Sequence, residues 1–329
     1  MTRTYEGSGV DQAGADALIP FFAKQAARTK RLEVVGDVGG FAGGFSLERL
    51  ADLGYRRPAL VVSTDGVGTK VEPLRAAGRH STAGWDAVAM NVDDVVCVGA
   101  EPLMLVDYVS VERLDQDVVR EIVTGVADAC ATAGCSLVGG ETSQHPGLLP
   151  PDGYDVVATC VGVVDVDRAW GPDRVQTGDE IVGLAATGPH ANGFSLIRAL
   201  VSEGGVPVPD ELLAPTGIYC RALLSAAEEV PVHAAAHVTG GGIAGNLSRV
   251  LPDGAGAYVD RQAWPRPGWM ELLLGWGVAE TEAYATFNGG LGMLAVTPEG
   301  EALVRALAGR GVEAWVVGAL EGPAGAHLR

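Results

Sequence analysis

The stretch from Ala59 to Lys70 combines the residue types that can hold a metal-chelated phosphate. A short β-branched run predicts a buried strand, and Asp65, two glycines, Thr69 and Lys70 follow it. Glycine lets backbone N–H groups approach phosphate oxygens, an aspartate can hold Mg²⁺, and a lysine supplies positive charge. The spacing is not that of a P-loop. A glycine turn that closes a hairpin would use the same residues, so the stretch predicts either a phosphate clamp or such a turn.

A carboxylate-rich arc follows on a helix that we predict over residues 84–100. Plotted at about 100° per residue, the apolar side chains fall on one side of this helix. The opposite arc holds Asp86, Met90, Asn91, Asp93 and Asp94. A solvated face is the usual meaning of a polar arc, but this arc contains no Lys, Arg or Glu. We therefore favour an arc that faces a metal or a nucleotide.

Two further glycine-rich segments lie in the first half of the chain. Five glycines within residues 36–44, among them Gly39 and Gly40, predict a loop that lets a ligand come close. This loop does not fit G-x-G-x-x-G, which disfavours a Rossmann site. A short strand over residues 136–138 then runs into Gly139-Gly140-Glu141-Thr142, a second strand end with a carboxylate. Asp107 falls on the apolar face of a predicted strand, so it must be paired or lie close to a ligand.

The second half of the chain carries two polar glycine loops. The loop at residues 187–193 contains His190 and Asn192 and precedes a predicted helix over residues 194–203. A helix N-terminus beside a histidine favours an oxyanion or a phosphate, although a lone histidine is often structural. Thr239 is followed by three glycines, Gly240, Gly241 and Gly242, at the start of another predicted helix. Such a turn can present several free N–H donors.

Composition limits the classes of function. The chain has 329 residues and a formal net charge of −18, which disfavours nucleic acid as a partner but permits a small phosphorylated ligand. Five cysteines without C-x-x-C spacing suggest neither a disulfide framework nor a zinc site. No apolar run reaches the length of a membrane span, and we see no signal-peptide pattern. We therefore expect a cytoplasmic protein without a membrane partner.

The order of predicted elements indicates an α/β (α+β) protein with two domains. Both halves mix strands with helices, and the glycine loops lie at strand ends, where ligands of α/β sheets gather. A junction over residues 165–179 gives domains 1–167 and 168–329. A helix over residues 15–31 ends in basic residues from Lys24 to Arg31, which form either a solvated helix end or a phosphate contact. We expect the tail from Glu321 to be loose.

In order and spacing, these motifs resemble one family, phosphoribosylformylglycinamidine cyclo-ligase, also called aminoimidazole ribonucleotide synthetase. The resemblance runs from Tyr5 to Gly318. It is carried by Gly9-Val10-Asp11, Val38-Gly39-Gly40-Phe41, Ser63-Thr64-Asp65-Gly66-Val67-Gly68-Thr69-Lys70, Ala89-Met90-Asn91-Val92-Asp93-Asp94, Gly99-Ala100-Glu101-Pro102, Asp107-Tyr108, Gly139-Gly140-Glu141-Thr142, Gly188-Pro189-His190-Ala191-Asn192-Gly193-Phe194-Ser195-Leu196, Thr239-Gly240-Gly241-Gly242 and Phe287-Asn288.

The resemblance implies an ATP-dependent, Mg²⁺-requiring ring closure in purine biosynthesis, with a small phosphorylated nucleotide as substrate. It implies nucleotide contacts by Gly39, Gly40, Asp65, Gly66, Gly68, Thr69, Lys70, Asn91, Asp94 and Glu141. The implied metal ligands are Asp65, Asp94 and Glu141, and the implied catalytic residues are His190, Lys70 and Asp65. Substrate contacts are implied for His190, Asn192, Thr239, Gly240, Gly241 and Gly242. The first domain would then bind ATP and the second would bind the substrate.

Family members are typically homodimers whose N-terminal sheets join into a barrel, which the resemblance extends to this chain. One departure follows Thr142, where the family commonly has Ala-Glu-Met-Pro-Gly and this chain has Ser143-Gln144-His145-Pro146-Gly147, without the carboxylate. Two other functions stay open. One is a formylglycinamidine ribonucleotide synthetase subunit that lacks a glutaminase. The other is a nucleotide-binding regulatory protein without turnover.

Overall fold

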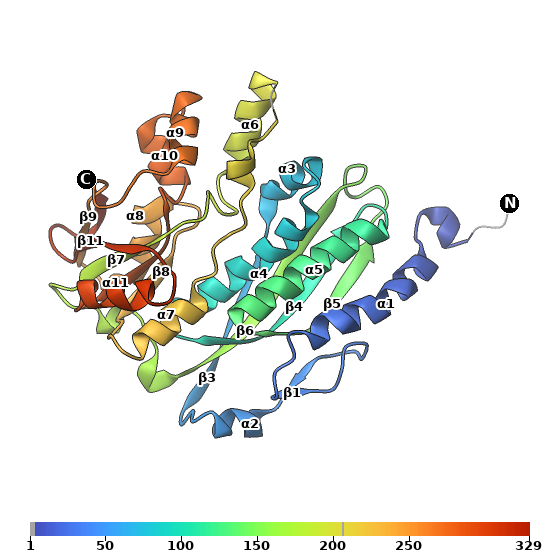
Figure 1. The fold of residues 1–329 in the computed structure, drawn as a ribbon, viewed down its shortest axis with the longest axis horizontal. Helices are drawn as coiled ribbons and strands as arrows, with labels where there is room; N and C mark the ends of the chain where they lie inside the picture. Colours follow the sequence, from blue (N-terminus) through green and yellow to red (C-terminus); the bar gives the residue numbers. More distant parts are fainter. Residues whose placement is uncertain (1–3, 206) are drawn as a thin grey trace. The chain divides into compact units, whose positions relative to one another are not determined.

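The chain forms two compact units, which the computed structural model describes for residues 4–205 and 207–329 (Figure 1). Unit 1 comprises the residues up to Val92 together with Pro102–Val163, and unit 2 comprises Asp93–Glu101 together with Val164–Arg329. The helix α4 (His80–Val96) contributes its last residues to unit 2. No helix in the described part of the chain is long and apolar enough to cross a membrane.

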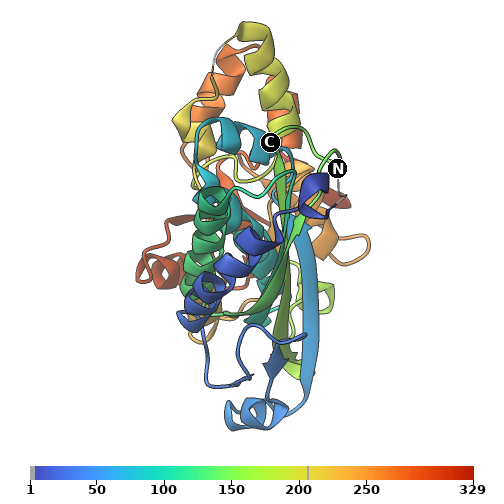
Figure 2. The same ribbon diagram turned by 90° about the vertical axis from the view of Figure 1, so that its right-hand side faces the viewer.

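Unit 1 is built on a four-stranded sheet with the strand order β3-β6-β4-β5. These strands are β3 (Pro58–Gly66), β6 (Tyr154–Asp165), β4 (Glu101–Val111) and β5 (Ser136–Gln144), and β4 and β5 run parallel. Helices α1 (Gln12–Ala27) and α5 (Gln116–Ala133) pack together on one face of the sheet (Figures 1 and 2). A small hairpin of β1 (Val34–Val35) and β2 (Gly44–Phe45) precedes α2 (Leu47–Asp52). The turn η2 (Gly68–Lys70) leads into α3 (Val71–Ala76).

Local sequence explains where α5 begins and ends. The carboxylate of Asp115 accepts hydrogen bonds from the backbone N–H groups of Asp117 and Val118, which caps the helix. Gly134 adopts a φ of 77° and ends it. The apolar stripe that the sequence predicts on this helix is buried, at Val119, Ile122, Val123, Val126 and Cys130. The helix therefore covers the sheet with the face that its periodicity indicates.

Unit 2 is built on a six-stranded sheet with the order β12-β9-β11-β7-β10-β8. Its strands are β7 (Glu180–Ala185), β8 (Ala234–His237), β9 (Gly256–Val259), β10 (Leu291–Thr297), β11 (Ala314–Ala319) and β12 (Gly325–Leu328). Its helices are α6 (Phe194–Gly204), α7 (Cys220–Ala227), α8 (Gly242–Leu247), α9 (Gly268–Gly275), α10 (Glu280–Thr286) and α11 (Gly300–Ala308). Helix α11 packs on the sheet and against α7.

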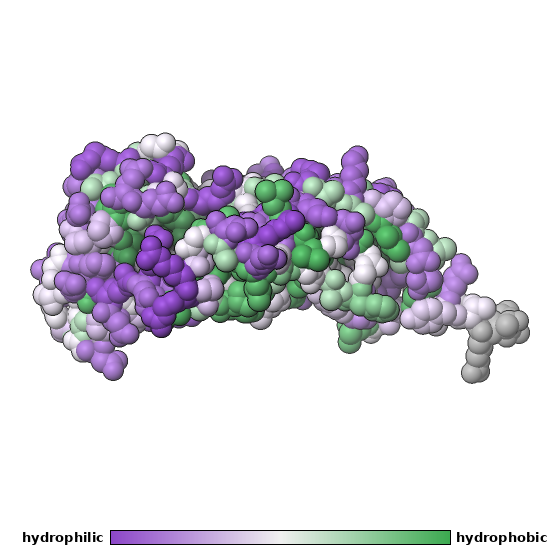
Figure 3. All heavy atoms as spheres, turned by 90° about the horizontal axis from the view of Figure 1, so that it is seen from below, coloured by the Kyte–Doolittle hydropathy of each residue, from purple (hydrophilic) through white to green (hydrophobic). Residues whose placement is uncertain are grey.

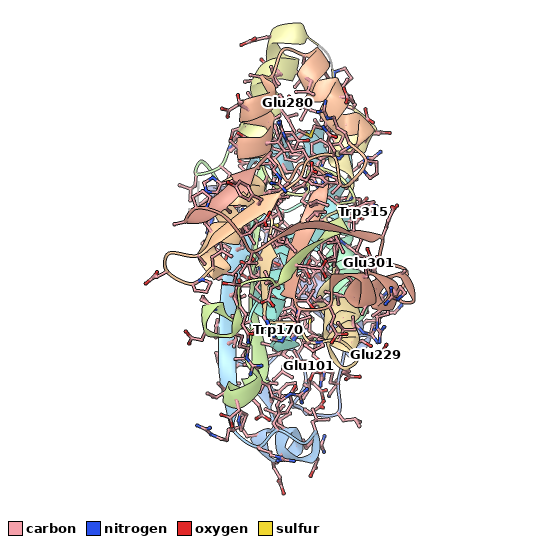
Figure 4. The ribbon with its side chains drawn as sticks, turned by 90° about the vertical axis from the view of Figure 1, so that its left-hand side faces the viewer. Glu101, Trp170, Glu229, Glu280, Glu301 and Trp315 are labelled. Carbon is pink, nitrogen blue, oxygen red and sulfur yellow. The ribbon has the colours of Figure 1, made fainter. Side chains whose placement is uncertain are left out.

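The segment Asp93–Glu101 is fixed within unit 2 by Trp170. The backbone N–H of Trp170 donates to the carbonyl of Val98 over 3.0 Å. The indole lies so close to Gly99 that a Cβ there would come within 3.0 Å of the ring, which accounts for a glycine with a φ of 75° at this position. Figure 4 labels Trp170 and also Glu101, the last residue of this segment.

The predicted mixed α/β class is confirmed, but four local expectations are wrong. The strand predicted to be buried is β3, and its Leu60 and Val62 side chains are 58% and 64% exposed. Asp65 and Gly66 do not follow β3 but form its end, while β5 runs through the second glycine–carboxylate motif to Gln144. Asp65 and Glu141 therefore lie within strands. The tail is not loose, because β12 pairs in parallel with β9 along Gly325–Leu328. The two glycines of β5 hid the strand's length from a propensity argument.

Candidate functional site

The end of β3 meets helix α4 within unit 1. The side-chain amide nitrogen of Asn91 donates to the backbone carbonyl of Asp65 over 3.1 Å and to that of Ala87 over 2.7 Å. The carboxylate of Asp65 accepts a hydrogen bond from the N–H of Gly66 over 2.7 Å. Asp65, Gly66 and Asn91 are thus brought together, as the sequence predicts, with Gly68 and Thr69 exposed on the turn that follows.

Lys70 points into unit 1 instead of toward a surface site. Its Nζ lies 2.7 Å from Oδ2 of Asp86 on α4, and both side chains have an exposed fraction of 0%. Burial lowers the pKa of Lys70, and the neighbouring Asp86 opposes that effect. The side chain in this position does not offer its charge to a phosphate at the surface. Sequence reasoning missed this because it gave no partner to Asp86.

The sequence predicts that the polar arc of α4 is not a solvated face, and the burial of most of its side chains agrees with this. The partners of these side chains, however, are other protein groups. Asp86, Asn91 and Asp93 have exposed fractions of 0%. In unit 2, Oδ1 of Asp93 accepts hydrogen bonds from the N–H groups of Tyr219 and Cys220 over 2.9 and 3.0 Å. Burial is the main cause that raises the pKa of Asp93 to about 7. The arc thus connects α4 to neighbouring elements.

A groove of about 540 Å³ runs between α1 and β5 in unit 1. Its lining includes Gln12, Asp16 and Phe22 from α1 and Glu141 and His145 from or just after β5. His145 is oriented by Ser110, whose hydroxyl lies 2.8 Å from its Nδ1. The groove is the largest of the described cavities in this unit.

Two smaller cavities lie in the same unit, and the first shares Phe22 and Glu141 with the groove. One, of about 70 Å³, lies among Phe22, Ala26, Val38 and Leu137 and has Asp107 on its wall. The other, of about 130 Å³, is lined by Ala26, Val38 and Leu137 and also by Lys30 and the start of the glycine loop. Gly39 and Gly40 are exposed in that loop. Lys30 itself pairs with Asp37 over 2.6 Å.

Asp107 is a buried carboxyl group beside this apolar cavity. Its exposed fraction is 9%, and burial raises its pKa to about 7, against a smaller lowering by its own backbone N–H. A Cβ at Gly140 would come within 2.1 Å of Oδ1 of Asp107, so only glycine leaves room for the carboxyl group here. The sequence predicts that Asp107 is paired or lies near a ligand. The structure puts its carboxyl group beside a cavity that a ligand could enter.

The three implied metal ligands do not form one cluster in the described structure. Asp65 lies on β3 and Glu141 on β5, the two outer strands of the sheet, with β6 and β4 between them. Among residues 4–205 and 207–329, no group of three or more His, Cys, Asp or Glu side chains could hold a metal ion. Within one chain, the strand order therefore puts Asp65 and Glu141 at opposite edges of this sheet. Asp94 belongs to unit 2.

His190 lies buried in unit 2, in the loop between β7 and α6. Its exposed fraction is 0%, and its φ of 59° is unusual for a residue with a side chain. Its Nε2 lies 3.4 Å from the hydroxyl of Tyr219 and 3.4 Å from the backbone nitrogen of Gly217. The loop therefore turns the imidazole toward the protein interior.

The two predicted substrate loops meet. Oδ1 of Asn192 accepts a hydrogen bond from the N–H of Gly240 over 3.1 Å. The turn Thr239–Gly242 is held from within by Asn246, whose amide nitrogen donates to the carbonyls of Thr239, Gly240 and Gly242. Gly241 and Gly242 have φ values of 96° and 64°, which favour glycine.

Sequence reasoning missed two side chains that surround His190. They are Tyr219 and His237, whose rings have centroids 6.1 and 6.5 Å from that of His190. Nδ1 of His237 lies 2.9 Å from Oδ1 of Asp94. The position of His237, at the end of a predicted strand and beside the triple glycine, could have indicated a site residue. No pattern in the sequence singles out Tyr219.

Comparisons with known proteins agree with one family throughout the chain. Residues 52–164 match the family model "AIR synthase related protein, N-terminal domain", and residues 176–328 match "AIR synthase related protein, C-terminal domain". The phosphoribosylformylglycinamidine cyclo-ligase of Anaeromyxobacter dehalogenans (strain 2CP-1 / ATCC BAA-258) is 44% identical over 335 residues, covering 98% of this chain and 96% of that protein. The protein of the same name from Myxococcus xanthus (strain DK1622) is 43% identical, with the same coverage.

Solved structures show the same fold at lower identity. Thiamine-monophosphate kinase from Stenotrophomonas maltophilia K279a has a TM-score of 0.71 and 20% identity and covers 95% of each chain. Hydrogenase maturation protein HypE in complex with ATP has a TM-score of 0.68 and 20% identity, covering 94% of this chain and 86% of that one.

These findings do not favour the two alternative functions, the glutaminase-less synthetase subunit and the regulatory protein without turnover. The relatives from Anaeromyxobacter dehalogenans and Myxococcus xanthus are cyclo-ligases, which form a C–N bond in an ATP-dependent reaction of purine biosynthesis. With two family models that together span most of the chain and 44% identity over nearly all of it, this chain belongs to the phosphoribosylformylglycinamidine cyclo-ligase family.

Proposed function

We propose that this chain converts formylglycinamidine ribonucleotide and ATP into 5-aminoimidazole ribonucleotide, ADP and phosphate, by way of a phosphorylated formyl oxygen. That oxygen is a poor leaving group. Transfer of the γ-phosphoryl group makes it an iminophosphate, the amidine nitrogen attacks the adjacent carbon, and phosphate leaves as the ring closes. The identity to cyclo-ligases over 98% of the chain is the observation that carries this proposal.

For the nucleotide, we propose the groove between α1 and β5. Its apolar end, lined by Phe22, Val38 and Leu137, suits a purine base, and the Asp107 carboxyl group on the same wall suits the amino group of adenine. Gly39 and Gly40, in the exposed loop near Lys30, suit the phosphates. The first domain, residues 1–167, then carries ATP.

For Mg²⁺, which neutralises charge on the transferred phosphoryl group, we propose Glu141 in this groove, because carboxylate oxygens are the ligands Mg²⁺ prefers. Asp65 and the neighbouring Gly66, Gly68, Thr69 and Asn91 form a second polar corner, which we propose as a further contact with phosphate or metal. Asp94 stays a candidate ligand in unit 2. For Lys70 we now propose a supporting role, since it pairs with Asp86 beneath that corner.

For the substrate, we propose the meeting point of the two loops in the second domain, residues 168–329. The amide nitrogen of Asn192 finds no acceptor among the described residues, so it is available to a ligand. Gly240 and Gly241 are exposed and can present backbone N–H groups, with Thr239 and Gly242 at their flanks. We propose that His190 contacts the reacting oxygen or accepts the proton that the amidine nitrogen loses. Because its imidazole is buried, this role requires the loop to open toward the substrate.

We also propose a homodimer through the open face of the unit 1 sheet. Leu60, Val62, Val106 and Tyr108 have exposed fractions of 58%, 64%, 40% and 39%. Such exposure is typical of a surface that a second copy covers. Figure 3, a view from below, shows that apolar residues also reach the surface among polar ones. Val62→Lys should yield a monomer in analytical ultracentrifugation, whereas Leu148→Lys, at a loop position that is 75% exposed, should not. A Val62→Lys protein that sediments as wild type would contradict this interface.

One assay tests the proposed reaction. Purified protein is supplied with ATP, Mg²⁺ and formylglycinamidine ribonucleotide, with and without glutamine, and the aminoimidazole product and ADP are measured. We expect product and ADP in equal amounts without glutamine. ATP binding without product would refute the proposed reaction. His190→Ala should lower kcat by about 10²- to 10⁴-fold with ATP affinity unchanged, and unaltered turnover would refute the role of His190.

A further inference from the structure

Two adjacent carboxylates at the end of α4, those of Asp93 and Asp94, bind the two elements whose side chains lie next to His190. Asp93 accepts the backbone N–H groups of Tyr219 and Cys220, which fixes the first turn of α7. Asp94 pairs with His237 on β8. All of these residues belong to unit 2. The end of α4 therefore sets the positions of Tyr219 and His237 independently of any bound ligand.

The tyrosine hydroxyl lies against the ring nitrogen of His190. It donates its hydrogen to the carbonyl of Ala185 over 2.8 Å, which leaves its oxygen lone pairs for Nε2 of His190 at 3.4 Å. The N–H of Gly217 points to the same nitrogen over 3.4 Å. Nε2 thus lies beside an acceptor and a donor, and the two favour different tautomers of the imidazole.

The backbone of β10 closes this arrangement at Gly292. A Cβ at position 292 would come within 2.1 Å of the Tyr219 hydroxyl and within 2.5 Å of Cε1 of His190. Only glycine lets the phenol and the imidazole lie against the strand at once. The contact between Tyr219 and His190 is therefore built into the sheet, and the family resemblance gave no role to this tyrosine.

We propose that Tyr219 is a positioning residue for ring closure: its hydroxyl fixes the orientation and tautomer of His190, and Asp93 holds the tyrosine in place. This inference rests on the role proposed for His190. Removal of the hydroxyl takes an acceptor away from Nε2, and the N–H of Gly217 that stays beside it favours the tautomer with its proton on Nδ1.

The test is Tyr219→Phe, which keeps the ring and removes only the hydroxyl. ¹⁵N spectra of the free protein report the protonation of each imidazole nitrogen, and His190→Ala assigns the His190 signals by their loss. We expect the Nε2 signal to move toward the unprotonated form. We also expect kcat to fall about 10- to 100-fold, with KM for the substrate within about 2-fold. Tyr258→Phe, on β9 of the same unit, is the matched control and should change neither.

A second pair of variants separates positioning from folding. Asp93→Asn keeps an oxygen that can accept from α7 and should retain most of kcat, whereas Asp93→Ala should reproduce the kcat loss and the spectral change of Tyr219→Phe. Unchanged His190 signals or unchanged kcat in Tyr219→Phe would overturn the inference and leave the proposed reaction standing. Full turnover by His190→Ala would instead refute the role of His190 itself.

Discussion

Lys70 in unit 1 and His190 in unit 2 both follow a strand in a glycine-containing turn, and both are fully buried, yet their surroundings differ. Lys70 forms an ion pair with a carboxylate, that of Asp86, at 2.7 Å. His190 faces the tyrosine hydroxyl and a backbone N–H, each at 3.4 Å. A full charge in the interior needs a full countercharge, whereas an imidazole can stay neutral between a donor and an acceptor. This difference is consistent with the supporting role that we propose for Lys70 and the proton transfer that we propose for His190.

The largest effect on stability is expected from Lys70→Met. This change leaves the Asp86 carboxylate buried without its cation and should lower the free energy of unfolding by about 3–5 kcal/mol. Urea unfolding measures this loss as the difference in the free energy of unfolding between wild type and variant. The double variant Lys70→Met/Asp86→Leu should recover most of the loss, because the remaining buried charge is gone.

A different result for Lys70→Met would support the role in phosphate binding that the sequence predicts for this lysine. If Lys70→Met unfolds like wild type but binds ATP much more weakly, Lys70 contacts a phosphate and the ion pair with Asp86 is incidental.

Asp107 is a buried carboxyl group in the same unit as Asp86 but without a lysine beside it, and it predicts a pH effect. Its raised pKa of about 7 means that the folded protein keeps a proton that the unfolded chain, with an aspartate pKa near 4, has released. The stabilisation is complete below about pH 4 and is lost as pH rises toward 7, with a total of up to about 4 kcal/mol. Asp107→Asn should remove this dependence.

Urea midpoints at intervals between pH 4.5 and 8 measure this effect as the difference between wild type and variant. Asp52→Asn, an exposed position at the end of α2, serves as the control and should leave the slope unchanged. An Asp107→Asn protein that keeps the wild-type slope would show that another group is responsible.

The smallest effect is expected from an exposed ion pair of unit 1. Arg113 and Asp152 lie 2.7 Å apart, like Lys70 and Asp86, but their exposed fractions are 72% and 66%. Arg113→Ala should change the free energy of unfolding by less than about 1 kcal/mol, because water already solvates both charges. A loss comparable with that of Lys70→Met would mean that burial is not what distinguishes the two pairs.

The sequence predicted the elements better than the partners of their side chains. Periodicity located α5 and its buried stripe, because apolar burial follows local spacing. It could not assign Asp86 to Lys70 or Asp93 to Tyr219, since these contacts join residues 16 and 126 positions apart. Even the shorter of these separations is too long for a local sequence pattern to pair the two residues.

The candidate site shows the same limit. The loops around Asn192 and Gly240 were predicted separately, and only the folded sheet of unit 2 brings them into contact. Glu141 and Asp65 looked equivalent in sequence, each a carboxylate after a short strand, but the strand order separates them. Strand order depends on long-range pairing, which local patterns do not encode.

The most direct test of this account is the turnover per folded molecule of Lys70→Met and His190→Ala. It is measured under conditions where circular dichroism shows that both variants are folded. The account predicts that Lys70→Met keeps a kcat within a few-fold of wild type, whereas His190→Ala loses about 10²-fold or more. A His190→Ala protein that turns over normally, beside a folded but inactive Lys70→Met, would contradict it.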